Sequence, residues 1–163
     1  MCTRRTVTLT VALLALAGCS SSGRDPVVEV SAQDATLNTR WHANLASPTS
    51  LAGVVQMRGS ASMAPSADGS ETNVTLTLAN ASPGGLHPWA VHRGQCGAAT
   101  DNGVFGRTEA YKALKVGDDG LADGAATVPL TTPRTGGYFV VVYASVANPE
   151  TVVACGNLAP PTR

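Results

Sequence analysis

Four cysteines and three histidines are the side chains of this 163-residue chain best suited to metal binding or covalent chemistry. Other catalytic patterns are missing from the sequence: no serine lies in a G-x-S-x-G elbow, and Gly84-Gly85 is typical of a turn rather than a phosphate-binding loop. Asp118-Asp119 is typical of a hairpin turn, so no acid/base pair and no catalytic residue is expected. The cysteines and histidines are Cys2, Cys19, Cys96, Cys155, His42, His87 and His92.

Cys19 ends a segment typical of exported bacterial lipoproteins. Arg4 and Arg5 precede an apolar run over residues 7–17, which is too short to cross a bilayer as a helix. Residues 16–19 (Leu-Ala-Gly-Cys) match the lipobox, in which small residues admit the peptidase and the cysteine sulfur receives a diacylglyceryl group. We therefore expect lipidation of Cys19. The alternative is an ordinary signal peptide that contains a cysteine by chance.

This interpretation divides the chain into a signal peptide (1–18), a flexible polar tether (19–37) and a single domain (38–163). The mature protein would be anchored by lipid in the bacterial cell envelope. Because Ser20 follows the cysteine, the outer membrane, facing the periplasm, is favoured for a Gram-negative cell.

The charge balance narrows the classes of partner. Without Arg4 and Arg5, nine of the eleven Lys and Arg residues remain against eleven Asp and Glu, and no run of basic residues occurs. A nearly neutral chain is a poor electrostatic partner for nucleic acid or for an anionic membrane surface. We expect no nucleic-acid partner, and we expect membrane contact only through the lipid anchor.

Cys96 and Cys155 are the two cysteines that remain once Cys2 is removed and Cys19 is lipidated. An even pair in an exported protein indicates a disulfide. Two free thiols that bind a metal are the alternative.

Alternation of apolar and polar residues predicts short strands. Residues 73–80 have the cleanest pattern, with Val74, Leu76 and Leu78 on one face. Only residues 108–114 have a helical pattern. Short strands joined by Gly-rich turns predict an all-β fold, an antiparallel sandwich or barrel. The other expected strands are residues 27–30, 41–45, 54–63, 86–92, 113–116, 125–129, 138–144 and 152–155, and turns are expected at 67–70, 82–85, 117–120 and 135–137.

Four segments in order resemble Cu,Zn superoxide dismutases. Residues 87–96 (HPWAVHRGQC) are similar to the family's H-G-F-H-V-H…G-x-C segment, and residues 114–120 to its D-G hairpin. Residues 138–144 resemble the strand that ends V-V-H, and residues 153–158 the closing A-C-G-V-I. Over about residues 50–158, the resemblance implies a Greek-key, immunoglobulin-like β-sandwich or barrel, with Cys96 and Cys155 as the family's intrasubunit disulfide.

At the positions that the resemblance assigns to metal ligands, this chain has few residues that can bind a metal. Ala90 replaces the first histidine of the copper-binding H-V-H pair, and His92 keeps the second. Tyr143 stands at the third copper-ligand position. Residues 97–113 contain no histidine for a bridging imidazole or a zinc site, and Val152 stands where the family has an anion-guiding arginine. One remnant copper-ligand position, His92, is therefore implied.

The three histidines receive different expected roles. His87 corresponds to the family's structural histidine, which hydrogen bonds to backbone and ligates no metal. His92 is expected to pack, with weak metal binding as the alternative, since one imidazole holds a metal poorly. His42 is expected to face solvent, and a new site that joins His42 and His92 is the alternative.

Together these patterns predict a catalytically degenerate, superoxide-dismutase-like lipoprotein that acts as a binding or structural module. No cofactor is expected, with copper as the alternative. The expected partner is another envelope protein or a second copy of the chain. A superoxide dismutase or copper-handling protein with an altered metal site is the alternative function, and a spacer without a partner is a third.

Overall fold

The computed structural model describes residues 39–54, 56–98 and 103–161. Within these ranges, all regular elements are strands except for two short 3-10 turns, so the prediction of an all-β fold is confirmed. The predicted signal peptide, lipobox, tether and strand at residues 27–30 lie outside the described residues. The elements are β1 (Trp41–Ala46), η1 (Thr49–Leu51), β2 (Arg58–Pro65), β3 (Thr72–Ala79), β4 (Leu86–His87), β5 (Trp89–Arg93), η2 (Thr108–Ala110), β6 (Leu114–Lys115), β7 (Ala122–Val128), β8 (Tyr138–Ser145) and β9 (Asn148–Leu158).

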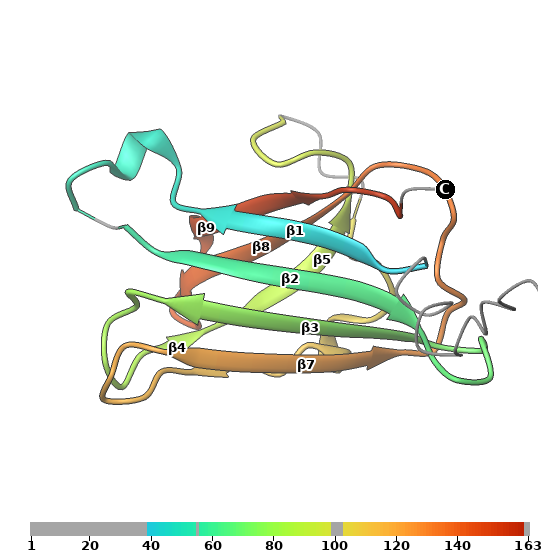
Figure 1. Cartoon of the computed structure of the whole chain (residues 1–163). Helices are drawn as coiled ribbons and strands as arrows, with labels where there is room; N and C mark the ends of the chain where they lie inside the picture. Colours follow the sequence, from blue (N-terminus) through green and yellow to red (C-terminus); the bar gives the residue numbers. More distant parts are fainter. Residues whose placement is uncertain (1–38, 55, 99–102, 162–163) are drawn as a thin grey trace, which may run out of the picture.

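Seven strands form one antiparallel sheet that curls into a half-barrel (Figure 1), in the order β5-β8-β9-β1-β2-β3-β7. The two short strands β4 and β6 pair with each other. Strands β1, β2 and β3 follow one another as hairpins, whereas β7 returns to pair with β3 and β9 returns to β1. Such long-range returns beside consecutive hairpins are connections of the Greek-key kind.

The alternation in β3 explains how a single sheet produces a core. Val74, Leu76 and Leu78 are buried on its inner face, as predicted, while the residues between them are exposed. On the outer face, the hydroxyl of Thr75 is hydrogen bonded to that of Ser62 on β2, over 2.8 Å. Apolar side chains therefore fill the concave side of the half-barrel and polar side chains cover this part of its convex side.

Buried aromatic side chains fix the long connections over the open side of the half-barrel. The indole Nε1 of Trp41 donates to the carbonyl oxygen of Pro133 (2.9 Å), and that of Trp89 donates to the carbonyl oxygen of Lys112 (2.8 Å). Trp89 also packs edge-to-face on Tyr111, with ring centroids 5.1 Å apart, and burial raises the pKa of Tyr111 above its usual value. Both indole N–H groups thus have an acceptor, and each of these hydrogen bonds ties a connection to the core.

Strand β8 is apolar on both faces, which distinguishes it from β1 and β3. Val140 and Val142 face the main core. Phe139 and Val141 point the other way and form a second, smaller apolar cluster with Cys155 of β9. This outer cluster lies on the convex side of the sheet, where the His92 ring packs near Phe139.

Glycine is required where β9 meets β1. A Cβ atom at Gly156 would overlap the carbonyl oxygen of Asn44 on β1. Close approach of the two strands therefore depends on the absence of a side chain at this position. Gly156 directly follows Cys155, so it also sets where the disulfide meets the sheet.

Two predicted elements differ from the structure in kind, and the predicted strands 54–63, 125–129 and 152–155 differ in their bounds from β2, β7 and β9. The strand expected over residues 86–92 is interrupted at Pro88, which has no N–H for the ladder, and its halves pair with different partners, β4 with β6 and β5 with β8. The helical pattern over residues 108–114 yields only the 3-10 turn Thr108–Ala110. The chain then extends into β6 because Tyr111 and Leu114 are buried in the barrel core.

Candidate functional site

His92 and Tyr143, two of the positions that the resemblance assigns to copper, lie together in the structure. His92 is on β5 and Tyr143 on the neighbouring strand β8, and the Tyr143 hydroxyl lies 3.1 Å from His92 Nε2 in a hydrogen bond. The His92 side chain is 5 % exposed. Ala90, two residues before His92, shares its face of the strand and offers only a methyl group. The arrangement is therefore a buried imidazole hydrogen bonded to a half-buried phenol.

His87 is held by the same tyrosine through the backbone. Its Nδ1 lies 2.9 Å from the Tyr143 carbonyl oxygen, and a carbonyl oxygen only accepts, so Nδ1 donates. The imidazole is buried, and its Nε2 has no hydrogen-bond partner among the described residues. His87 thus bonds to strand backbone, as the structural role expected for it requires.

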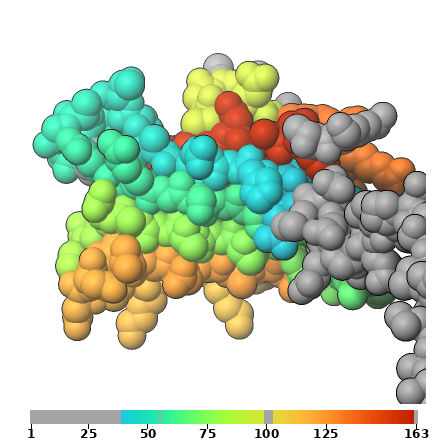
Figure 2. All heavy atoms as spheres, in the orientation of Figure 1, coloured from blue at the N-terminus to red at the C-terminus, as the bar shows by residue number. Residues whose placement is uncertain are grey.

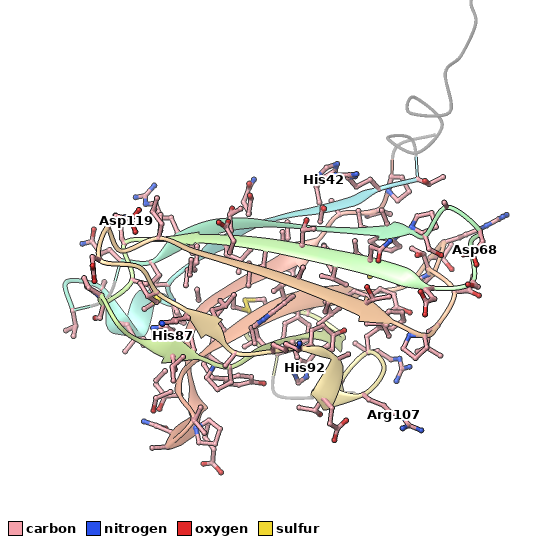
Figure 3. All side chains as sticks on the ribbon, turned by 90° about the horizontal axis from the view of Figure 1, so that it is seen from below. His42, Asp68, His87, His92, Arg107 and Asp119 are labelled. Carbon is pink, nitrogen blue, oxygen red and sulfur yellow. A yellow bond between two sulfur atoms is a disulfide. The ribbon has the colours of Figure 1, made fainter. Side chains whose placement is uncertain are left out.

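His42 lies apart from the other two histidines. It is exposed on the outer face of β1, as predicted, and Figure 3 shows it on a different side of the molecule from His87 and His92. The structure therefore does not bring His42 and His92 into a common site. Across the three described ranges, no cluster of three or more His, Cys, Asp or Glu residues is placed to hold a metal ion.

Cys96 and Cys155 form the predicted disulfide, with their Cα atoms 5.9 Å apart. The bond links the loop after β5 to β9. A second link lies beside it, because the backbone N–H of Cys96 donates to the side-chain oxygen of Asn157 over 2.8 Å. The loop that contains Cys96 is therefore attached to the outer face of the sheet at two points.

A half-open cavity of about 670 Å³ lies over the outer cluster, and we call it the outer pocket. Its floor comprises Phe139, Val141 and Val152 together with the disulfide, and His92 and Tyr143 also line it. Residues 46–49 form one wall and residues 96–98 the other. Figure 2 shows the loop after β1 and the loop after β5 as separate projections with a hollow between them.

The outer pocket differs from most of the protein surface in the kind of side chain that lines it. None of its lining residues is Asp, Glu, Lys or Arg. Val152, which only the resemblance aligns with a guiding arginine, contributes an apolar side chain to the floor. The histidine and tyrosine are thus the titratable groups of a mostly apolar cavity.

Sequence analysis identified His92, Tyr143 and the cysteines but missed the pocket itself. The signal that could have found it is the unbroken apolar run Phe139-Val140-Val141-Val142, which indicates a strand covered on both faces. The sequences of the two walls have no comparable pattern. Residues 46–49 and 96–98 are far apart in the chain, and only the folded structure brings them to the same pocket.

Two acidic turns have structural explanations. In the β6–β7 turn, the Asp119 carboxylate accepts a hydrogen bond from the backbone N–H of Leu121 over 3.0 Å, as expected of a hairpin turn. In the β2–β3 turn, the Asp68 carboxylate accepts from the hydroxyls of Ser66 (2.6 Å) and Ser70 (2.8 Å). These bonds, led by that from Ser66, lower the pKa of Asp68 to about 2.

Comparison of the chain with protein-family models gives no match, and a search of curated proteins gives none either. In the part of the chain that the structure describes, no helix has the length and apolar character needed to span a membrane.

Proposed function

We propose that this protein is a cell-envelope lipoprotein whose superoxide-dismutase-like domain is catalytically degenerate and acts as a binding or structural module. The observation that carries the proposal is the hydrogen bond between His92 Nε2 and the Tyr143 hydroxyl. Two strand positions that resemble copper-ligand positions converge, but they carry one imidazole and one phenol.

Dismutation requires a redox metal that alternates between two oxidation states. Copper with that role is held by several imidazoles, and nitrogen ligands of this kind determine its affinity and geometry. Here the partner of His92 is a phenol whose hydroxyl is hydrogen bonded to Nε2, and Ala90 has no donor atom. A metal at this place would have to displace Tyr143 from His92 and would gain a single imidazole.

Two further features support the envelope part of the proposal. The sequence of residues 16–19 matches a lipobox, and the Cys96–Cys155 disulfide suits an oxidising compartment outside the cytosol. The Greek-key connections agree with the fold that the resemblance implies.

Copper loading tests the catalytic part. The purified protein is incubated with copper, washed, and measured for bound metal and for superoxide turnover, alongside a double variant with Ala90→His and Tyr143→His. We expect substoichiometric copper and no turnover from the wild type, and a gain of copper in the double variant, because its three histidines would share one face.

The same experiment decides the alternative function. Stoichiometric copper in the wild type, with turnover lost in His92→Ala, would overturn the proposal in favour of a dismutase with an altered site. Copper without turnover would favour copper handling. Circular dichroism of each variant establishes that the fold is retained before metal is counted.

A further inference from the structure

The geometry points to a ligand site in the outer pocket for a neutral ring compound that carries a hydrogen-bonding group. The inference rests on the proposed function, since it specifies what the binding module would bind. Three observations carry it: the size of the cavity and its lack of Asp, Glu, Lys and Arg, the fixed position of its walls, and the His92–Tyr143 pair beside its apolar floor.

The first observation is the match of volume and charge. About 670 Å³ falls within the range of small-molecule sites, about 300–1,000 Å³. Three other cavities on the described surface each include at least one arginine, Arg58, Arg93 with Arg107, or Arg40, whereas the outer pocket has no charged side chain. A charged ligand would lose hydration in this cavity without meeting an Asp, Glu, Lys or Arg side chain, so a neutral ligand fits.

The second observation is that both walls are held before any ligand arrives. In one wall, the Ser47 hydroxyl donates to the carbonyl oxygen of Val153 (2.8 Å) and accepts from the backbone N–H of Met57 (2.9 Å). The other wall is held by the disulfide and by the Cys96–Asn157 hydrogen bond. A cavity whose walls are already fixed loses little conformational entropy on binding.

The third observation is the distribution of polarity inside the pocket. Phe139 and Val141 provide an apolar floor on the outer surface of the sheet, which suits an aromatic ring. The Tyr143 hydroxyl, hydrogen bonded to His92 Nε2, brings a polar group into the same cavity. A phenol oxygen has two lone pairs, so the Tyr143 oxygen can accept a hydrogen bond from a ring hydroxyl while it remains bonded to His92.

Calorimetric titration of the purified full chain with three probes tests the site. The probes are 2-naphthol, which is neutral with a hydroxyl, naphthalene, which lacks the hydroxyl, and 2-naphthoate, which is anionic. We expect 2-naphthol to bind about two- to tenfold more tightly than naphthalene, the usual value of one hydrogen bond. We expect 2-naphthoate to bind most weakly.

Variants locate the binding. Val152→Glu places a charge in the floor and should weaken 2-naphthol binding at least tenfold, while Val146→Glu, at an exposed position in the β8–β9 turn, should not. Tyr143→Phe should remove the preference for 2-naphthol over naphthalene and leave naphthalene binding unchanged. Thermal unfolding of each variant is measured first, and a variant that does not fold is replaced by Ala98→Trp, which fills the cavity from an exposed wall position.

Several outcomes would overturn the inference. One is a dissociation constant for 2-naphthol above about 1 mM. The others are equal affinity of the Val152→Glu and Val146→Glu proteins for 2-naphthol, and affinity for 2-naphthoate as high as for 2-naphthol. Any of these would leave the proposed function standing as a structural module. Copper-dependent turnover, by contrast, would overturn the proposed function, so the two failures are distinguishable.

Discussion

His87 donates a hydrogen bond from Nδ1 to the backbone carbonyl oxygen of Tyr143 over 2.9 Å. The Tyr143 N–H in turn donates to the carbonyl oxygen of Pro88 over 2.8 Å. Tyr143 lies where the β8–β9 register shifts on both of its sides. A buried imidazole therefore supports β8 at the point where its pairing with β9 is irregular, and this support fixes the tyrosine that meets His92.

His87→Ala should lower the free energy of unfolding by about 3 kcal/mol, because the change removes a buried hydrogen bond and leaves a cavity. Urea denaturation measures the loss. His42→Ala is the matched control, since His42 is exposed, and should change stability by less than about 0.5 kcal/mol. Equal effects of the two substitutions would contradict a structural role for His87.

Loss of the disulfide should destabilise the fold through the unfolded state. Cys96 and Cys155 are 59 residues apart, and closing a loop of that length contributes about 4 kcal/mol on the chain-entropy model. The double variant Cys96→Ser, Cys155→Ala should show this loss in denaturant titrations, and reduction of the wild type should give a similar value. Peptide mapping without reductant should recover the linked pair, and two alkylatable thiols would refute it.

The Asp68 carboxyl should titrate near pH 2 in the folded protein, below its ordinary 3.8, because the charged form accepts hydrogen bonds from Ser66 and Ser70. A depressed folded-state pKa stabilises the turn above the unfolded-state value, and this contribution is lost as the pH falls toward about 2. Carbon-detected NMR of the side chain reports the titration. Ser66→Ala should move the pKa toward 3.8, and an unchanged value would show that the hydroxyl is not the cause.

Lipidation of Cys19 is expected from the sequence alone. Wild-type protein should partition with membranes and carry the mass of a lipid on its N-terminal cysteine, since the diacylglyceryl group is joined through sulfur. Cys19→Ser should release or misprocess the protein. Membrane fractionation with mass spectrometry of the N-terminal peptide makes the measurement. Soluble wild-type protein that begins at another residue would refute the lipobox assignment.

Features that depend on local pattern were predictable from sequence. The alternation of Val74, Leu76 and Leu78 gave the buried face of β3, since side chains on a strand alternate strictly between faces. The disulfide was predicted from the cysteine count, on the expectation that the chain is exported. Pro88 shows the limit: the residue was visible, but the change of pairing partner that it produces depends on where β6 and β8 lie.

Features that depend on long-range approach were not predictable. The His92–Tyr143 hydrogen bond joins residues 51 positions apart, and only the resemblance suggested their proximity. The wall around Ser47 approaches Val153, 106 positions away, through polar and small residues without a distinctive pattern. A run such as residues 108–114 favours a helix locally, but burial of Tyr111 and Leu114 in the core overrides that preference.

The pairing of His42 with Ala159 brings the two ends of the described domain together, through reciprocal backbone hydrogen bonds of 3.2 and 2.7 Å. Termini so close can be joined by a short linker and the chain reopened elsewhere. The exposed β2–β3 turn around Gly69 is a suitable place to cut, because it lies outside the core. A circular permutant with ends there would place an anchor or a fusion partner at the turn between β2 and β3, whose outer faces are polar. The β5, β8 and β9 segments of the outer pocket would stay continuous.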